Sequence, residues 1–127
     1  MIVGIGVDII EVDRIQKSIE NFGDKFLERV FTQGEIEYCE KKNVQKFQSY
    51  AGKFAAKEAI FKAVSNQLTN KYDIEWKDIE VLNDEVGRPV AYFHGKLEEI
   101  IGNSFSVSIS ISHVDKMAVA NCICEKL

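Results

Sequence analysis

The sequence holds little of several features on which whole classes of protein depend. Its 127 residues include three cysteines, two histidines and one proline. Three cysteines without a paired spacing give no disulfide framework, so we expect free, buried thiols in a reducing compartment. Two histidines and no Cys/His cluster argue against a zinc site. The sequence also has no Ser/His/Asp triad signature, no G-x-x-x-x-G-K-[ST] loop and no G-x-G-x-x-G fingerprint.

Excess positive charge and long apolar runs are absent as well. The net charge is −4, which argues against nucleic acid as the main partner. No apolar run approaches the length of about 18 residues that a membrane span needs. Residues 1–10 are apolar, but no basic region precedes them and Glu11 follows at once, so we predict a strand there and not a signal peptide. We expect a cytoplasmic protein with no nucleic-acid or membrane partner.

What the chain does have is enough apolar material for one core, since 46% of its residues are hydrophobic. Its length predicts a single domain over residues 1–127. Periodicity and turn residues predict helices at 11–22, 25–30, 33–42, 45–66 and 96–101. They predict strands at 2–10, 79–82, 90–93, 104–112 and 117–124. This order favours an α+β fold in which an antiparallel sheet packs against one long helix.

Several local signals support these boundaries. Thr32 and Glu35 have the spacing of a capping box, and Gly23 suits the end of the first helix. Residues 83–89 combine Asn, Asp, Gly and the proline of the chain, which is typical of a turn. Residues 104–112 alternate apolar side chains with serine, so we predict a half-buried strand.

Glu58 is the residue whose position is hardest to explain by structure alone. In the long helix it falls among the members of an apolar face, which are Phe47, Tyr50, Ala51, Phe54, Ala55 and Phe61. A buried carboxylate is costly unless it is paired, hydrogen-bonded or bound to a metal. One interpretation is that Lys62, one turn later, neutralises it. The other is a metal ligand or a general base, and Mg²⁺ suits two carboxylates with substrate phosphates.

Asp8 is the expected partner of Glu58. In the first strand, Gly4, Gly6 and Asp8 share one face, and the other face is apolar. The glycines allow a ligand or another chain to approach the backbone closely. The alternative is that Asp8 faces solvent while the glycines pack against a helix.

The cations near Glu58 have simpler explanations. Lys53 and Lys57 lie to one side of the apolar face, and we expect Lys57 to be solvated. Lys62 lies at the edge of that face, where it could contact a bound phosphate. His113 falls in a predicted hairpin turn, where it is either exposed and idle or a donor to a phosphate oxygen.

These residues form a series that resembles a known family. The segments are GIGVDIIE (4–11) with Arg14, FT (31–32) with Glu35, FAAKEA (54–59) with KA (62–63), DIEV (78–81) with ND (83–84), Gly87 and Pro89, and SISISH (108–113). The series resembles holo-[acyl-carrier-protein] synthase, the small bacterial type of 4′-phosphopantetheinyl transferase, from end to end.

The resemblance implies a fold and a reaction. Such enzymes have the α+β 4′-phosphopantetheinyl transferase fold, with active sites between the subunits of a homotrimer. They move the 4′-phosphopantetheine group from coenzyme A to a serine of apo acyl carrier protein and release adenosine 3′,5′-bisphosphate. The reaction is Mg²⁺-dependent and serves fatty acid biosynthesis.

The resemblance also implies roles for individual residues. Asp8 and Glu58 match the Mg²⁺ ligands and, with Lys62 near the pyrophosphate, the catalytic group. Glu58, or a metal-bound water that it orients, is the implied base. The coenzyme A contacts would be Lys53, Lys62, Gly87, Arg88, Pro89, Ser112 and His113, with the 87–89 turn on the adenine side. Arg14 matches the face that grips the acidic carrier protein.

The chain departs from the family pattern at three places. Lys53 stands where arginine is usual, and a lysine lacks the bidentate fork. Residues 64–67 replace a glycine-rich stretch, and Arg88 replaces a common lysine. The first two departures leave open a non-catalytic subunit that binds coenzyme A or carrier protein. A third hypothesis is a Mg²⁺-dependent pyrophosphate hydrolase that uses the same two acids.

Overall fold

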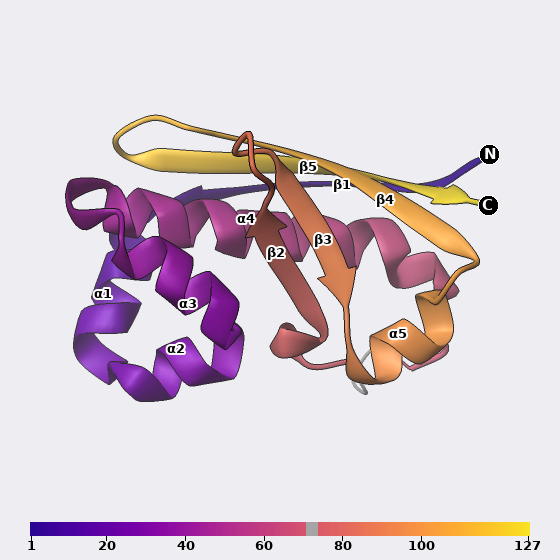
Figure 1. The fold of residues 1–127 in the computed structure, drawn as a ribbon, viewed down its shortest axis with the longest axis horizontal. Coiled ribbons are helices and arrows are strands. Elements are labelled where there is room, and N and C mark those ends of the chain that lie inside the picture. The colour runs from indigo at the N-terminus through magenta and orange to yellow at the C-terminus, as the bar shows by residue number, and fades with distance from the viewer. Residues whose placement is uncertain (71–73) are drawn as a thin grey trace.

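The computed structural model describes residues 1–70 and 74–127, and it has the predicted α+β arrangement (Figure 1). The α-helices are α1 (Val12–Phe22), α2 (Asp24–Val30), α3 (Gln33–Glu40), α4 (Lys46–Val64) and α5 (Gly95–Ile101). The strands are β1 (Ile2–Glu11), β2 (Ile79–Asn83), β3 (Pro89–Phe93), β4 (Phe105–His113) and β5 (Met117–Lys126). Each predicted element is present, with ends that differ by one to two residues in most cases.

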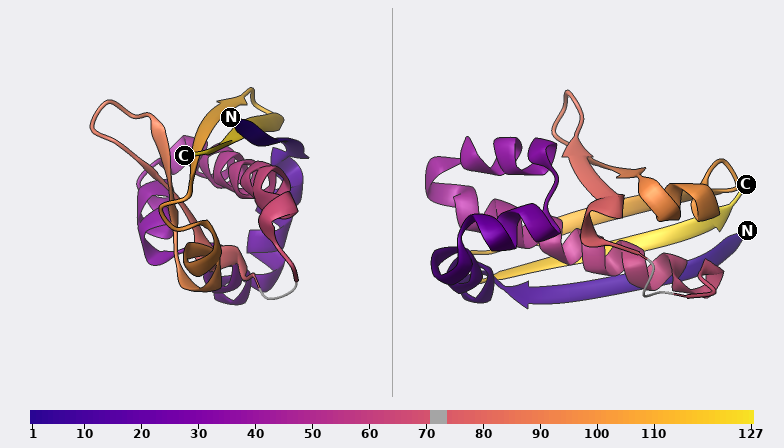
Figure 2. Two further views of the ribbon diagram at one scale, coloured as in Figure 1. Left: turned by 90° about the vertical axis from the view of Figure 1, so that its right-hand side faces the viewer. Right: turned by 90° about the horizontal axis from the view of Figure 1, so that it is seen from below.

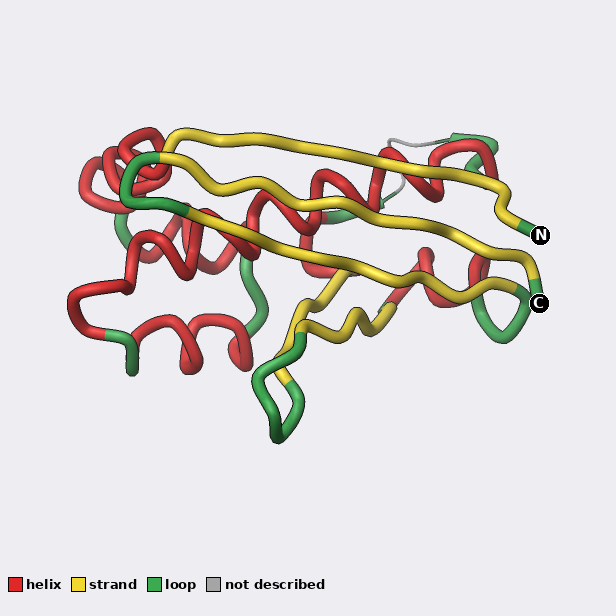
Figure 3. Tube along the Cα trace, turned by 90° about the horizontal axis from the view of Figure 1, so that it is seen from above, coloured by secondary structure: helices red, strands yellow, loops and turns green. Residues whose placement is uncertain are grey.

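The strands form two antiparallel sheets. The larger sheet has the order β1-β5-β4, and the smaller is the hairpin β2-β3. In Figure 3 the three long strands run side by side above α4, and the turn of the β2-β3 hairpin projects from the body of the molecule. The first strand of the chain therefore pairs with the last strand, so the larger sheet brings together the two ends of the sequence.

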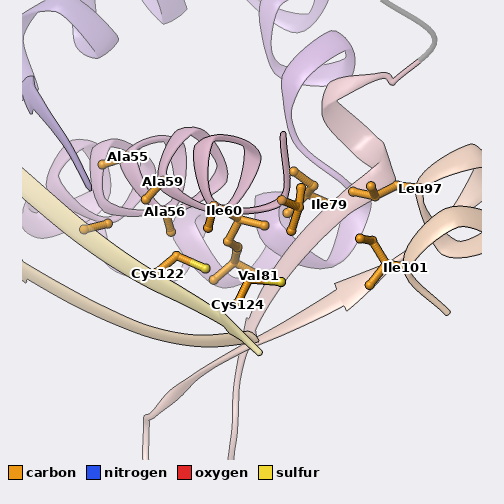
Figure 4. Packing of buried hydrophobic residues seen from close by; sticks show 13 residues of the cluster. Ala55, Ala56, Ala59, Ile60, Ile79, Val81, Leu97, Ile101, Cys122 and Cys124 are labelled. Carbon is orange, nitrogen blue, oxygen red and sulfur yellow. The ribbon is translucent and has the colours of Figure 1, made fainter. Parts of the chain in front are cut away.

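Two hydrophobic clusters surround α4. The larger lies between α4, the sheets and α5, where Ile60, Val81 and Ile101 are fully buried (Figure 4). The smaller lies between the first part of α4 and the helices α1 to α3, which gather at one end of the molecule (Figures 1 and 2). In this second cluster the ring centroids of Tyr50 and Phe31 lie 5.0 Å apart. As a result, most of the surface of α4 is covered.

Gly4 and Gly6 set the contact between β1 and α4. A Cβ atom at Gly4 would overlap the backbone oxygen of Ala63, and one at Gly6 would overlap the oxygen of Ala59. Strand and helix backbones therefore touch without intervening side chains, which confirms the interpretation that the glycines pack against a helix. Asp8 continues the same row toward the middle of α4.

The opposite face of β1 is apolar and exposed. Ile5, Val7 and Ile9 have exposed fractions of 73%, 55% and 63%. The period of two divides the strand into two faces, but it does not say which face lies inward. Here the small residues face the helix, because only they allow its backbone so close.

The cysteines are free and buried, as expected from the sequence. Cys39 belongs to the cluster around α1 to α3, whereas Cys122 and Cys124 project from β5 into the larger cluster. Burial raises the pKa of the Cys39 thiol to about 11 and that of Cys122 to about 12. Among the described residues, no helix is long and apolar enough to cross a membrane.

Candidate functional site

Asp8 and Glu58 meet at one cavity, although they are far apart in the sequence. The cavity has a volume of about 390 Å³ and lies between β1, α1 and α4. Asp8 enters it from β1 because the glycine row holds that strand on α4. Glu58 enters it from the helix, and Phe54, Ser18 and the exposed Arg14 complete this part of its wall. The structure thus brings together the two carboxylates and the cation predicted to bind a partner.

Lys62 lies beside Asp8, not beside Glu58. Its Nζ donates to the backbone oxygen of Val7 at 2.9 Å and to Asp8 Oδ1 at 3.3 Å. Its side chain is 51% exposed. Among the described residues, no ion pair joins Lys62 to Glu58, so the interpretation that Lys62 neutralises Glu58 as a helical ion pair is wrong. Half of the lysine remains open to a ligand.

Glu58 is half-buried and has a perturbed acidity. Burial raises its pKa, the charge of Asp8 raises it further, and Lys62 opposes the shift. Two like charges at one cavity are a strained arrangement that a divalent cation would relieve.

The donor set suits Mg²⁺. In the described part of the chain, no group of three His, Cys, Asp or Glu side chains could hold a metal alone. Mg²⁺ is commonly bound by one or two carboxylates, with waters and substrate phosphates as its other ligands. Asp8 and Glu58 therefore fit a Mg²⁺ that arrives with a phosphorylated substrate, and they do not fit a closed metal cage.

A second cavity begins at Glu58. It has a volume of about 220 Å³, and the side chains of Phe61, Ile74 and Trp76 give it apolar walls. Trp76 also stacks on Phe54, with 5.0 Å between the ring centroids, and Phe54 lines the Asp8 cavity. Glu58 therefore lines both cavities, the charged one that contains Asp8 and the apolar one that contains Trp76.

Lys53, Gly87, Pro89 and His113 gather at a third cavity of about 290 Å³. This cavity, called the hairpin cavity below, lies between the β2-β3 turn, the end of β4 and the first half of α4. Ser49 lines it and differs from Glu58 by about 180° around the helix. The predicted site residues thus fall on opposite sides of α4.

Besides Lys62, two of the predicted coenzyme A contacts lie outside the lining of this cavity. Arg88 is exposed between Gly87 and Pro89, and Ser112 is exposed on β4. Neither belongs to the residues that line the hairpin cavity. Both remain predictions.

Lys57 was expected to be solvated, and this expectation is wrong. Its side chain is fully buried, with Nζ 2.7 Å from Glu35 Oε1. It also donates to the backbone oxygens of Val30 at 2.9 Å and Ile79 at 2.6 Å. Burial lowers the pKa of Lys57, and Glu35 opposes that shift. The ion pair therefore ties α4 to α3 and to β2.

Glu35 is the partner of Lys57, and the sequence did not reveal this pairing. The capping box was predicted, and it is present: Glu35 Oε1 accepts the N–H of Thr32 at 2.8 Å. Its other oxygen accepts the N–H of Val81 at 2.7 Å. The capping pattern explains one oxygen but carries no sign that the same carboxylate receives a lysine from another helix.

The predicted apolar face of α4 also needs correction. Tyr50, Ala51 and Ala55 are buried as predicted, but the three phenylalanines of that face are only half-buried. Outside the face, Lys53 is only 3% exposed and Lys57 is fully buried. A helix covered on most sides has no single apolar face. Glu58 therefore stands at the border of the buried surface, where a ligand can reach it.

Comparisons with known proteins give one consistent result. The family model described as the 4′-phosphopantetheinyl transferase superfamily matches residues 4–121. A holo-[acyl-carrier-protein] synthase of Solibacter usitatus is 44% identical over 98% of this chain and 99% of its own length. One of Clostridium tetani is 46% identical over 98% of this chain and 97% of its own length.

Solved structures agree with these sequence relatives. A holo-(acyl-carrier-protein) synthase of Bacillus anthracis in complex with CoA (3′,5′-ADP) aligns with a TM-score of 0.80 and 38% identity. The alignment covers 100% of this chain and 99% of that one. A Helicobacter pylori holo-[acyl-carrier-protein] synthase in complex with coenzyme A aligns with a TM-score of 0.80 and 31% identity, over 95% and 99% of the two chains.

Proposed function

The chain belongs to the 4′-phosphopantetheinyl transferase superfamily, and from this premise we propose that it is a holo-[acyl-carrier-protein] synthase. It transfers the 4′-phosphopantetheine group of coenzyme A to a serine of apo acyl carrier protein and releases adenosine 3′,5′-bisphosphate. The observation that carries this proposal is the meeting of Asp8 and Glu58 at one cavity, with Lys62 paired to Asp8.

Asp8 and Glu58 would hold Mg²⁺ together with the diphosphate of coenzyme A. When bound there, Mg²⁺ neutralises charge that develops on the leaving bisphosphate. Lys62 adds a positive charge on the same side, and its exposed half can reach a phosphate oxygen. Phosphoryl transfer depends mainly on such positioning and electrostatic stabilisation.

The acceptor serine would enter from the side of Arg14. Its Oγ forms a bond to the phosphorus that carries pantetheine, and the bond from that phosphorus to the bridging oxygen of the diphosphate breaks. Glu58 would accept the hydroxyl proton as general base. Arg14, exposed at the rim of the same cavity, suits an acidic carrier protein.

The apolar cavity beside Glu58 suits the pantetheine arm. The arm is attached to the reacting phosphorus, so it must leave the site next to Glu58. Phe61, Ile74 and Trp76 offer an apolar recess at that point. This assignment leaves the nucleotide end of coenzyme A to be bound elsewhere.

We propose that the nucleotide end lies in the hairpin cavity of a neighbouring subunit. The body of α4 separates that cavity from Glu58 within one chain, so a second copy must supply it. The exposed row of Ile5, Val7 and Ile9 offers an apolar surface for such an assembly. A homotrimer with active sites between subunits satisfies both observations.

A charge placed in the apolar row tests this assembly. We expect Val7→Lys to lower the mass measured by light scattering from that of a trimer to that of a monomer and to abolish transfer, because the lysine would be buried unpaired. Val86→Lys, at an exposed valine of the hairpin tip, should leave the mass unchanged. A Val7→Lys monomer with normal activity would contradict an inter-subunit site.

The wider setting follows from the reaction. We propose that residues 1–127 act as one domain and that the holo carrier protein serves fatty acid biosynthesis. The three free thiols support a cytoplasmic location, because such cysteines persist in a reducing compartment.

Intact-mass spectrometry of apo acyl carrier protein tests the function directly. With this protein, coenzyme A and Mg²⁺, we expect the carrier mass to rise by one 4′-phosphopantetheine group and adenosine 3′,5′-bisphosphate to appear in equal amount. Chelation of Mg²⁺ should stop both changes. A carrier whose acceptor serine is replaced by alanine is the control and should stay unmodified. Tight coenzyme A binding without product would indicate a binding subunit, and phosphopantetheine released without any acceptor would indicate a hydrolase.

A further inference from the structure

Lys53 lines the hairpin cavity but is 3% exposed. We propose that it is a positioning residue, which holds the β2-β3 turn in place for the nucleotide and does not itself contact a phosphate. This inference rests on the proposed function only in naming coenzyme A as the ligand of the cavity. Lys42, at the rim of the same cavity, is the cation left to meet a phosphate monoester there.

The ammonium of Lys53 is fully occupied by the protein. Its Nζ donates to the backbone oxygen of Val81 at 2.6 Å and to Asn83 Oδ1 at 2.8 Å. It also lies 4.4 Å from the centroid of the Tyr38 ring. An ammonium has three donors, so two hydrogen bonds and an aromatic face leave none directed into the cavity.

Asn83 carries this anchor to the cavity wall. Its Nδ2 donates to the backbone oxygen of Gly87 at 3.1 Å. Gly87 has a φ of +87°, which favours glycine at this point of the turn. The turn projects from the molecule (Figure 3), and its other hydrogen bonds run within residues 84–88. The connection from Lys53 through Asn83 to Gly87 therefore ties the turn to α4.

Lys42 differs from Lys53 in each of these respects. It is exposed, and it lines the same cavity. Its Nζ lies 4.7 Å from the Tyr38 ring centroid, and among the described residues its side chain has no hydrogen bond or ion pair. With only the aromatic face as a partner, Lys42 keeps at least two donors available to a phosphate.

The identity of residue 53 strengthens the inference. An arginine has five donors in a planar fork and could hold Asn83 while it also reached a ligand. A lysine with both of its hydrogen bonds directed at the hairpin cannot do both. In this chain the two tasks are divided between residues 53 and 42.

A comparison of two nucleotides separates positioning from phosphate contact. Dephospho-coenzyme A lacks only the 3′-phosphate monoester, and calorimetry gives the Kd of both ligands without any need for turnover. We expect Lys53→Met to raise both Kd values by about tenfold, the effect of losing one hydrogen bond from a charged donor. Lys42→Met should raise the Kd of coenzyme A by about tenfold and leave that of dephospho-coenzyme A unchanged.

Further readouts keep the proposal falsifiable. The kcat for transfer at saturating coenzyme A should stay within about twofold of wild type in both variants, since a positioning residue acts on binding. Asn83→Ala should reproduce the Lys53→Met pattern, and the double variant should be no weaker than either single one. Asn83→Ala also provides the test if Lys53→Met fails to fold. A Lys53→Met defect confined to coenzyme A would overturn the proposal, whereas absent transfer by the wild type would count against the proposed function alone.

Discussion

Asp8→Asn and Glu58→Gln are each expected to lower the rate of carrier-protein labelling by about 10²–10⁴-fold. Both substitutions keep the size of the side chain and remove the charge that would hold Mg²⁺. Glu58→Gln also removes the group that we propose as acceptor of the serine proton. The rate is measured by intact-mass spectrometry at saturating coenzyme A and Mg²⁺.

The loss should not come from unfolding. Glu58→Gln removes the repulsion between Glu58 and Asp8 that contributes to the raised pKa of Glu58, so its thermal unfolding temperature should equal or exceed that of the wild type. Glu99→Gln makes the same chemical change at an exposed residue of α5 and should keep full activity. Normal turnover by both site variants with Mg²⁺ chelated would rule out the mechanism.

Lys57→Met is expected to lower the free energy of unfolding by about 3–5 kcal/mol, the usual cost of breaking a buried ion pair. The substitution preserves an unbranched chain but leaves the Glu35 carboxylate buried without its cation. It also removes the lysine donor from the backbone oxygens of Val30 and Ile79. Urea unfolding followed by far-ultraviolet circular dichroism gives the value.

The chain offers a matched control for this variant. Lys17 and Asp13 form an ion pair at 2.9 Å, with side chains 68% and 67% exposed. Because water screens such pairs, Lys17→Met should cost less than about 1 kcal/mol. Glu35→Gln combined with Lys57→Met should cost less than the sum of the single variants, because neither charge is then left alone. Equal effects of Lys57→Met and Lys17→Met would show that burial gives the inner pair no added role.

The elements of the fold were accessible from the sequence because their signals are local. The Thr32 capping box, the turn around Gly87 and the serine alternation of β4 each depend on a few neighbouring residues, and all are present. Pairing of β1 with β5 joins the two ends of the chain. Nothing local specifies that pairing, and the sequence analysis did not predict it.

The candidate site was partly accessible for the same reason. Glu58 was predicted as a site residue because it is a carboxylate within an apolar pattern. Asp8 was predicted because it is an acid beside two glycines. Lys57 was misplaced because a lysine on a helix is normally exposed, and its partner Glu35 lies on another helix. Only tertiary packing distinguishes such a lysine from a solvated one.

The three buried thiols can be used to measure how often parts of the protein open. Cys39 lies in the cluster around α1 to α3, whereas Cys122 and Cys124 lie under the large sheet. Thiol reagents react with the thiolate form of cysteine. Burial keeps the reagent away from these thiols, and it also raises the pKa of Cys39 and Cys122, so that less thiolate is present. Alkylation therefore occurs only when a cluster opens. The labelling rate of each cysteine peptide would show which of the two clusters opens more often.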